Sequence, residues 1–100
     1  MEFLIDITVR LPPTLPAEEV AALMSGERQR GRELLESGAI RDIWRVPGAL
    51  RNVAIWSAQD ATELHALLTS LPFHPYCEVS VTPLAVHPLR GGPEGGTANS

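Results

Sequence analysis

Lysine is absent from this chain of 100 residues, which has one cysteine and only 5% aromatic residues. Every fixed positive charge is therefore a guanidinium, a group suited to binding carboxylates. The formal net charge of −4 argues against a general nucleic-acid binder. The single Cys77 excludes an internal disulfide and fits a reducing compartment, and we expect it to be a small buried side chain on a strand.

No hydrophobic run approaches membrane-spanning length, and the amino-terminal residues lack the basic stretch of a signal peptide. The sequence thus predicts a cytoplasmic protein without a membrane partner. No histidine or cysteine pair has metal-ligand spacing, so we expect no metal site. Nucleophile elbows, glycine-rich phosphate loops and dinucleotide fingerprints are also missing.

The chain has 44% hydrophobic and 20% charged residues, a composition typical of one folded domain. A chain this short buries a modest core, which favours additional burial through self-association. We place the domain at residues 1–88. Residues 89–100 are rich in glycine and have no core-forming pattern, so we expect a disordered tail there.

Hydrophobic periodicity predicts four strands and two helices. Alternation predicts strands at 2–10, 40–46, 50–57 and 76–82, and helical spacing predicts helices at 17–37 and 61–70. Gly38 is expected to end the first helix and Asp60 to cap the second. The order β-α-β-β-α-β indicates an α+β, ferredoxin-like fold, in which a four-stranded antiparallel sheet carries both helices on one face.

The other face of such a sheet would be bare in a monomer. Leu4 and Ile43 are expected on that face, so we predict that the protein dimerises through the sheet.

One acidic residue stands out in the first predicted helix. The apolar positions of this helix form a stripe at helical spacing: Val20, Leu23, Met24, Gly31, Leu34 and Leu35. Glu27 falls near the centre of the stripe. A carboxylate directed at a core is unfavourable unless it is paired, hydrogen-bonded or protonated. Two interpretations stay open: a general base in a pocket between the helix and the sheet, or a structural carboxylate paired with Arg30 or a sheet arginine.

Two glycines flank this glutamate. Gly26 and Gly31 each cost about 1 kcal/mol of helix propensity relative to alanine. We expect that small residues at these positions let another segment approach the helix closely.

Several arginines are clustered in the predicted second and third strands. Arg41 and Arg45 are expected on one face of the second strand, with Ile43 between them, and Arg51 follows the turn at 47–48. They could clamp an anionic substrate, or they could be solvated charges or salt bridges between subunits. Because surface arginines are common and contribute little energy, the second interpretation is the simpler one from these residues alone.

Several blocks, taken together and in order, resemble the muconolactone delta-isomerase family, including its chloromuconolactone dehalogenase-like relatives. They span residues 3–88: TVRLP at 8–12, Glu27, WRVPG at 44–48, Asn52, LH at 64–65, LPFHPY at 71–76 and HP at 87–88. The resemblance implies a ferredoxin-like fold, dimers that assemble into decamers, and neither metal nor organic cofactor. It also implies a cofactor-free isomerase of the bacterial catechol (beta-ketoadipate) pathway, which moves a proton on a butenolide and so converts muconolactone to 3-oxoadipate enol-lactone.

The same resemblance assigns roles to individual residues. Glu27 would be the catalytic acid/base that removes a proton from the ring carbon carrying the acetate arm and returns it beside the carbonyl. The candidate substrate-binding residues are Arg28, Arg45, Arg51 and Asn52. Arg28 stands where the family has a lysine and would neutralise the acetate or the developing oxyanion.

The chain departs from the family pattern at four positions. Ala49 and Leu50 stand where the family has His-Tyr, and Leu4 and Asp42 stand where it has histidines. These changes remove polar and aromatic groups from possible pocket walls, so two alternatives stay open. One is an isomerase, cyclase or dehalogenase acting on a different lactone or a polyketide-like compound. The other is a non-catalytic oligomeric binding module, which predicts an ordinary pKa for Glu27 and no enclosed pocket.

Overall fold

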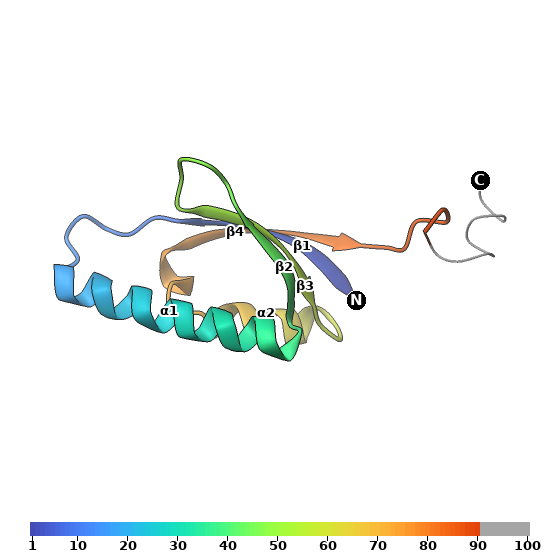
Figure 1. Ribbon diagram of the computed structural model, residues 1–100, viewed down its shortest axis with the longest axis horizontal. Helices are drawn as coiled ribbons and strands as arrows, with labels where there is room; N and C mark the ends of the chain where they lie inside the picture. The colour runs from blue at the N-terminus through green and yellow to red at the C-terminus, as the bar shows by residue number, and fades with distance from the viewer. Residues whose placement is uncertain (91–100) are drawn as a thin grey trace.

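The structure, a computed structural model, describes residues 1–90. Its elements are β1 (Glu2–Val9), α1 (Ala17–Ser37), β2 (Ile40–Arg45), β3 (Arg51–Ser57), α2 (Ala61–Thr69), the 3₁₀ helix η1 (His74–Tyr76) and β4 (Cys77–Leu84). The antiparallel sheet has the strand order β2-β3-β1-β4. Both helices lie against the same face of the sheet (Figure 1). The predicted α+β, ferredoxin-like fold is confirmed.

The two predicted helix-end signals are also confirmed. Gly38 ends α1 with a φ of 84°, a conformation that favours glycine, and its N–H donates to the Leu35 carbonyl. The Asp60 side chain caps α2 by accepting a 2.8 Å hydrogen bond from the Glu63 N–H.

The core lies between the sheet and the helix layer. Its buried residues are Phe3, Ile5, Ile7, Leu34, Ile40, Ala54, Trp56, Ala58, Leu64, Leu68 and Leu71. Within α1, Leu34 is the buried residue, whereas Leu35 is 45% exposed, so the predicted apolar stripe is narrower than expected. Met24, which is 38% exposed, lies in the amino-terminal half of α1, and this half extends beyond α2 (Figure 1).

A β-bulge in β2 changes the alternation of its side chains. Ile40 lies opposite Trp56, but Asp42 lies opposite Ile55, so Arg41 is an extra residue on this edge strand. An inserted residue shifts every later side chain by one position relative to simple alternation.

Two predictions about β2 are wrong because of this bulge. Arg41 and Arg45 do not share a face, since Arg41 pairs with Glu2 at 3.5 Å while Arg45 lies on the helix-covered side. Ile43 is not on the bare face, because it lies opposite the buried Ala54. A single bulge therefore brings an arginine to the same side of the sheet as α1.

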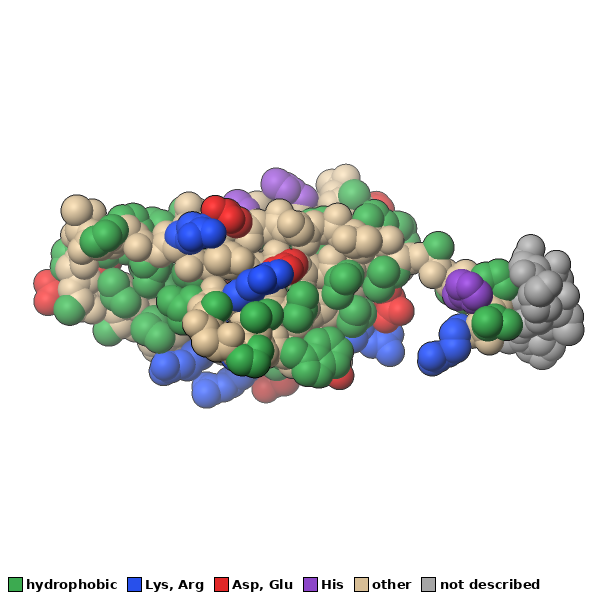
Figure 2. Space-filling view, turned by 90° about the horizontal axis from the view of Figure 1, so that it is seen from above, with side chains coloured by type: hydrophobic (Ala, Val, Ile, Leu, Met, Phe, Trp, Pro, Cys, Tyr) green, Lys and Arg blue, Asp and Glu red, His purple; other side chains and the backbone are tan. Residues whose placement is uncertain are grey.

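The opposite face of the sheet is not covered by any element of residues 1–90, and Figure 2 shows hydrophobic side chains and charged pairs on it. The register places the following hydrophobic residues there: Leu4, Trp44, Val53, Ile55 and Leu84. Among them, the guanidinium of Arg51 donates two hydrogen bonds to the Asp6 carboxylate, at 2.9 and 2.7 Å. This face thus has apolar side chains around the Arg51–Asp6 ion pair, and it also carries the Asp42 carboxylate of the edge strand β2, opposite Ile55.

After β4 the chain leaves the sheet, and residues 88–90 form a turn in which the Arg90 N–H donates to the His87 carbonyl at 2.8 Å. The tail predicted at 89–100 begins in this turn, and residues 91–100 lie outside the described residues. Within residues 1–90, no helix has the length and apolar character needed to cross a membrane.

Candidate active site

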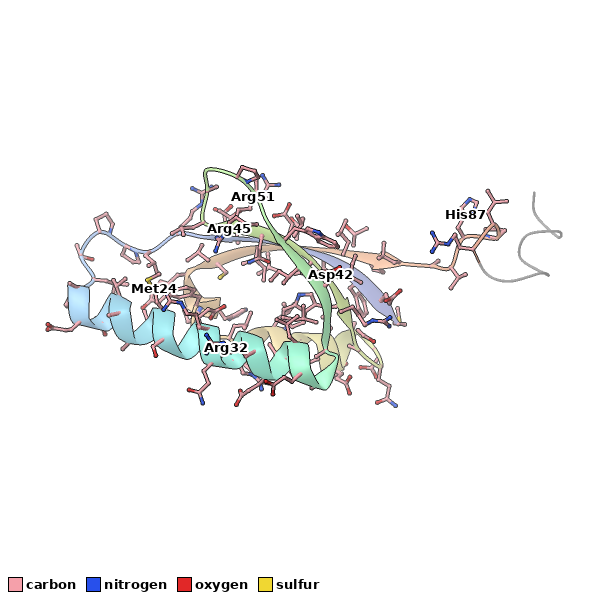
Figure 3. The ribbon with its side chains drawn as sticks, viewed as in Figure 1. Met24, Arg32, Asp42, Arg45, Arg51 and His87 are labelled. Atoms are coloured by element: carbon pink, nitrogen blue, oxygen red, sulfur yellow. The ribbon has the colours of Figure 1, made fainter. Side chains whose placement is uncertain are left out.

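A pocket of about 190 Å³ lies between α1 and the sheet. It is lined by Ile7, Val9, Met24, Glu27, Arg28, Arg45, Leu50, Asn52 and Phe73. Figure 3 labels Met24 and Arg45, which stand on two different walls, one on α1 and the other on β2.

Local structure explains how these side chains meet. Met24, Glu27 and Arg28 are spaced three and four residues apart on α1, and this spacing places them on one side of the helix. On the sheet, Asn52 of β3 lies between Ile7 of β1 and Arg45 of β2 in adjacent strands. The pocket therefore has one helical wall and a floor of three neighbouring strands.

Glu27 is the half-buried carboxylate of this pocket. Its Oε1 accepts a 2.9 Å hydrogen bond from the backbone N–H of Phe73. Burial raises the pKa of the Glu27 carboxyl above its ordinary value, and the Phe73 hydrogen bond lowers it by less. Arg30 does not pair with Glu27; it donates to Ser70 at 2.9 Å and contacts Glu33 at 3.3 Å. No arginine among residues 1–90 forms the structural ion pair considered above as an alternative.

Two arginines give the pocket a positive balance. Neither Arg28 nor Arg45 has a carboxylate partner in residues 1–90, and Arg45 Nη1 lies 3.5 Å from the Ala49 carbonyl oxygen. With Glu27 ionised, the pocket holds one negative and two positive formal charges, which favours an anionic ligand.

Asn52 adds an uncharged polar group. Its Oδ1 is buried and has no hydrogen-bond partner in the described part of the chain. A buried amide oxygen without a partner is unfavourable, so a ligand that reaches it would gain binding energy. Because the two ends of an amide exchange by rotation, Asn52 can offer either a donor or an acceptor.

Arg51, the other predicted substrate-binding residue, lies outside the pocket. It belongs to the opposite face of the sheet, where it hydrogen-bonds to Asp6, and Figure 3 labels it on the upper side of the sheet, away from α1 and α2. The Arg51 hydrogen bond keeps the pKa of the Asp6 carboxyl below its ordinary value. Neighbouring strand residues point to opposite faces, so Asn52 and Arg51 cannot both face α1.

Two groups near Glu27 were not connected with it by the sequence reasoning. The Phe73 N–H is a backbone donor 46 positions away in the chain, and a backbone group carries no side-chain signal. Cys77 lies partly buried and its Sγ donates to the Phe73 carbonyl at 3.1 Å. Burial, together with the nearby charge of Glu27, raises the pKa of the Cys77 thiol to about 11, so this thiol is protonated at neutral pH.

Within the described residues, no three histidine, cysteine, aspartate or glutamate side chains are grouped closely enough to hold a metal ion. The pocket itself offers one carboxylate and one amide beside two guanidinium groups, a donor set that disfavours a cation.

Together, the fold and the pocket define a small α+β protein with a half-buried carboxylate beside two guanidinium groups, an arrangement that favours a small anionic ligand. Comparison with known proteins identifies its relatives. The family model described as Muconolactone delta-isomerase matches residues 1–90. The chain therefore belongs to the muconolactone delta-isomerase family, a family of isomerase enzymes, as its sequence blocks predicted.

Individual relatives agree with this assignment. The Muconolactone Delta-isomerase of Cupriavidus pinatubonensis is 35% identical over 88 residues, which cover 88% of this chain and 96% of that protein. Muconolactone Delta-isomerase 2 of Acinetobacter lwoffii is 34% identical over 87 residues, covering 87% and 91%. A crystal structure of muconolactone isomerase at 3.3 Å resolution is 30% identical, with a TM-score of 0.83 over 88% of this chain and 92% of that one.

Proposed function

We propose that the protein converts muconolactone to 3-oxoadipate enol-lactone by moving one proton, without a cofactor, and that Glu27 is the acid/base. The observation that carries the proposal is the half-buried Glu27 carboxyl in a pocket with two guanidinium groups that lack carboxylate partners in residues 1–90. Membership of the family supports the choice of substrate. We further propose a cytoplasmic location, which cell fractionation would test.

In this mechanism Glu27 takes the proton from the ring carbon that carries the acetate arm. The electrons of the broken C–H bond enter the ring and give a dienolate, whose negative charge rests on the lactone carbonyl oxygen. The same carboxyl then returns the proton to the carbon beside the carbonyl, and the ring double bond shifts. Substrate and product are isomers, so one group that first accepts and then donates a proton is sufficient.

The environment of Glu27 suits this role. Burial raises the pKa of its carboxyl, which makes the carboxylate a stronger base than a solvated glutamate. Since Phe73 holds Oε1, the other carboxylate oxygen is left for the substrate.

The two arginines match the charges that develop during the reaction. The substrate has one negative charge on its acetate arm, while the dienolate intermediate has a second on the lactone oxygen. Arg28 and Arg45 can each neutralise one of them, and Asn52 can hydrogen-bond to the lactone. A second cation stabilises the intermediate more than the substrate, and this difference is what accelerates a reaction.

Replacing Glu27 tests the proposal directly. The Glu27→Gln variant keeps an oxygen that can accept the Phe73 hydrogen bond but cannot take a proton at neutral pH. We expect turnover of muconolactone, followed by ultraviolet absorbance, to fall by about 10²- to 10⁴-fold, with an unchanged circular dichroism spectrum. Activity near that of the wild type would exclude Glu27 as the acid/base.

A second candidate function keeps the chemistry and changes the lactone. Apolar side chains form much of the pocket wall, and Leu50, which is 54% exposed, stands there in place of a family polar or aromatic residue. This wall favours a substrate with an apolar substituent. A panel of enolisable lactones would decide: turnover of another lactone but not of muconolactone, abolished by Glu27→Gln, would favour this function. The pocket and the raised pKa of Glu27 argue against a non-catalytic module.

A further inference from the structure

Helix α1 meets the segment that follows α2 along one line of contacts. Gly26 lies against Pro72, since a Cβ added at Gly26 would be 3.3 Å from Pro72 Cγ. The next residue, Glu27, accepts the hydrogen bond from the Phe73 N–H. One turn later, Arg30 Nε donates to Ser70 Oγ at 2.9 Å. Residues 70–73 therefore lie along the side of α1 that carries the glutamate.

The second glycine of the helix differs from the first. A Cβ added at Gly31 would meet nothing within 4 Å. Both glycines lie in the helix interior, where each has the same propensity disadvantage. The expectation that both admit a close neighbour thus holds for Gly26 alone, and Gly31 is a matched control for it.

The backbone of Phe73 is hydrogen-bonded on the side away from Pro72. Its carbonyl accepts hydrogen bonds from the Tyr76 N–H at 2.8 Å and from Cys77 Sγ at 3.1 Å. On the other side of Pro72, Leu71 is buried in the core. Because Pro72 is bonded directly to the nitrogen that faces Glu27, a displacement of its ring also displaces this donor.

Given the proposed function, we propose that Gly26 is a positioning residue for catalysis. The absence of a Cβ at Gly26 lets Pro72 pack against the helix, which brings the Phe73 amide onto Oε1 of Glu27. The glutamate is then held by one oxygen, with the other available to move the proton.

The Gly26→Ala variant should disturb this arrangement. The new Cβ requires Pro72 to move by a few tenths of an ångström. We expect this movement to lengthen the hydrogen bond between the Phe73 N–H and Glu27. That hydrogen bond favours the charged carboxylate, so weakening it raises the pKa of Glu27 further. The charged and titratable groups around Glu27, namely Arg28, Arg45 and Cys77, are unchanged in the variant.

We expect the acid limb of the kcat/KM profile to move to higher pH in Gly26→Ala. We also expect kcat to fall by about three- to tenfold, because small displacements of a reacting group are costly in rate, with KM nearly unchanged. Gly31→Ala should leave both the pH profile and kcat as in the wild type.

A carbon-13 NMR titration of the glutamate carboxyls tests the proposal independently of turnover, with Glu27→Gln identifying the Glu27 resonance. The proposal requires a higher pKa of Glu27 in Gly26→Ala and an unaltered one in Gly31→Ala. An unaltered pKa in Gly26→Ala, or an equal rise in both variants, would overturn it. If the wild type does not turn over muconolactone, the proposed function fails while this titration still gives its answer.

If Gly26→Ala does not fold, a pair of variants replaces it. Pro72→Ala removes the Cγ atom that the new Cβ would meet. The double variant Gly26→Ala/Pro72→Ala should therefore fold and give the same pKa for Glu27 as Pro72→Ala alone. A different pKa in the double variant would show that Gly26 acts by something other than its contact with Pro72.

Discussion

The Glu27 carboxyl affects stability as well as chemistry, because folding removes part of it from water. The raised pKa means that the folded protein binds the carboxyl proton more tightly than the unfolded chain does. The resulting stabilisation is fully present below the ordinary glutamate pKa of 4.5 and is lost as the pH rises through the folded-state pKa. Above its folded-state pKa, the ionised Glu27 is thus a stability cost retained at the site, as expected where function and stability conflict.

The raised pKa of Glu27 leads to a prediction for the stability of Glu27→Gln. The variant has no charge to desolvate and should have a higher Tm than the wild type at neutral pH, by a few degrees at most. The difference should shrink as the pH falls below the folded-state pKa of Glu27. Thermal unfolding followed by circular dichroism across this range gives the measurement. A variant that is less stable by the same amount at every pH would show that Glu27 instead stabilises the fold.

Two arginines of neighbouring strands allow a matched comparison. Arg45 lines the pocket, whereas Arg51 hydrogen-bonds to Asp6 on the other face of the sheet. Loss of one charge-assisted hydrogen bond to the substrate should lower kcat/KM in Arg45→Gln by about 10- to 100-fold. In Arg51→Gln we expect kcat/KM close to that of the wild type at protein concentrations that preserve the wild-type oligomeric state. A loss of kcat/KM in Arg51→Gln but not in Arg45→Gln would instead indicate that the substrate binds on the uncovered face of the sheet.

Helix α2 precedes the segment whose Phe73 N–H donates to Glu27, and it is only nine residues long. A helix of this length depends on tertiary packing and on its cap rather than on propensity. Leu64 and Leu68 supply the packing, and the Asp60 carboxylate supplies the cap.

Removal of the cap should therefore be measurable. Asp60→Ala leaves the Glu63 N–H without its acceptor and should lower the free energy of unfolding by about 1 kcal/mol, which corresponds to a fall in Tm of roughly 4–8 °C for a domain of this size. Asp60→Asn keeps a capping oxygen and serves as the control. If both variants unfold at the wild-type temperature, the cap contributes nothing to α2.

The elements differ in how well periodicity predicts them. Helix α1 has the predicted bounds because its stripe, its proline-rich start and Gly38 all agree. The faces of β2 were mispredicted because one bulged residue, Arg41, inverts the alternation without leaving a mark in the composition. A helix such as α1 is predictable because its periodicity and its end signals agree. For β2, which contains a bulge, only the register with β3 shows which side chains face α1.

For the whole molecule, we propose that two copies pair through the uncovered face of the sheet. Leu4, Trp44 and Leu84 are 36%, 51% and 39% exposed on this face. The Arg51–Asp6 pair in its midst already satisfies its own charges, so a partner could cover it without leaving a lone charge buried. Further assembly of dimers, as in the decamers implied by the family resemblance, would use other surfaces.

A charge on this face should prevent pairing. Light scattering after size exclusion should give a dimer or a multiple of it for the wild type and a smaller particle for Leu4→Asp, because a carboxylate would face an apolar partner. Leu35→Asp places the same charge on an exposed position of α1 and is the control. A monomeric wild type, or equal masses for all three proteins, would exclude this interface.

Composition and local pattern were sufficient for the element order, the fold class and the suspicion about Glu27, since these depend on neighbours within one helix or strand. The family was predicted from the resemblance of sequence blocks spread over residues 3–88. Arg28 and Asn52 could likewise be named from the family blocks. Only the tertiary structure decided three features of the site. They are the hydrogen bond from the Phe73 amide to Glu27, the approach of Pro72 to Gly26, and the separation of Arg45 from Arg51 on opposite faces of the sheet. These contacts join positions far apart in sequence and involve backbone atoms and strand register, which side-chain periodicity does not encode.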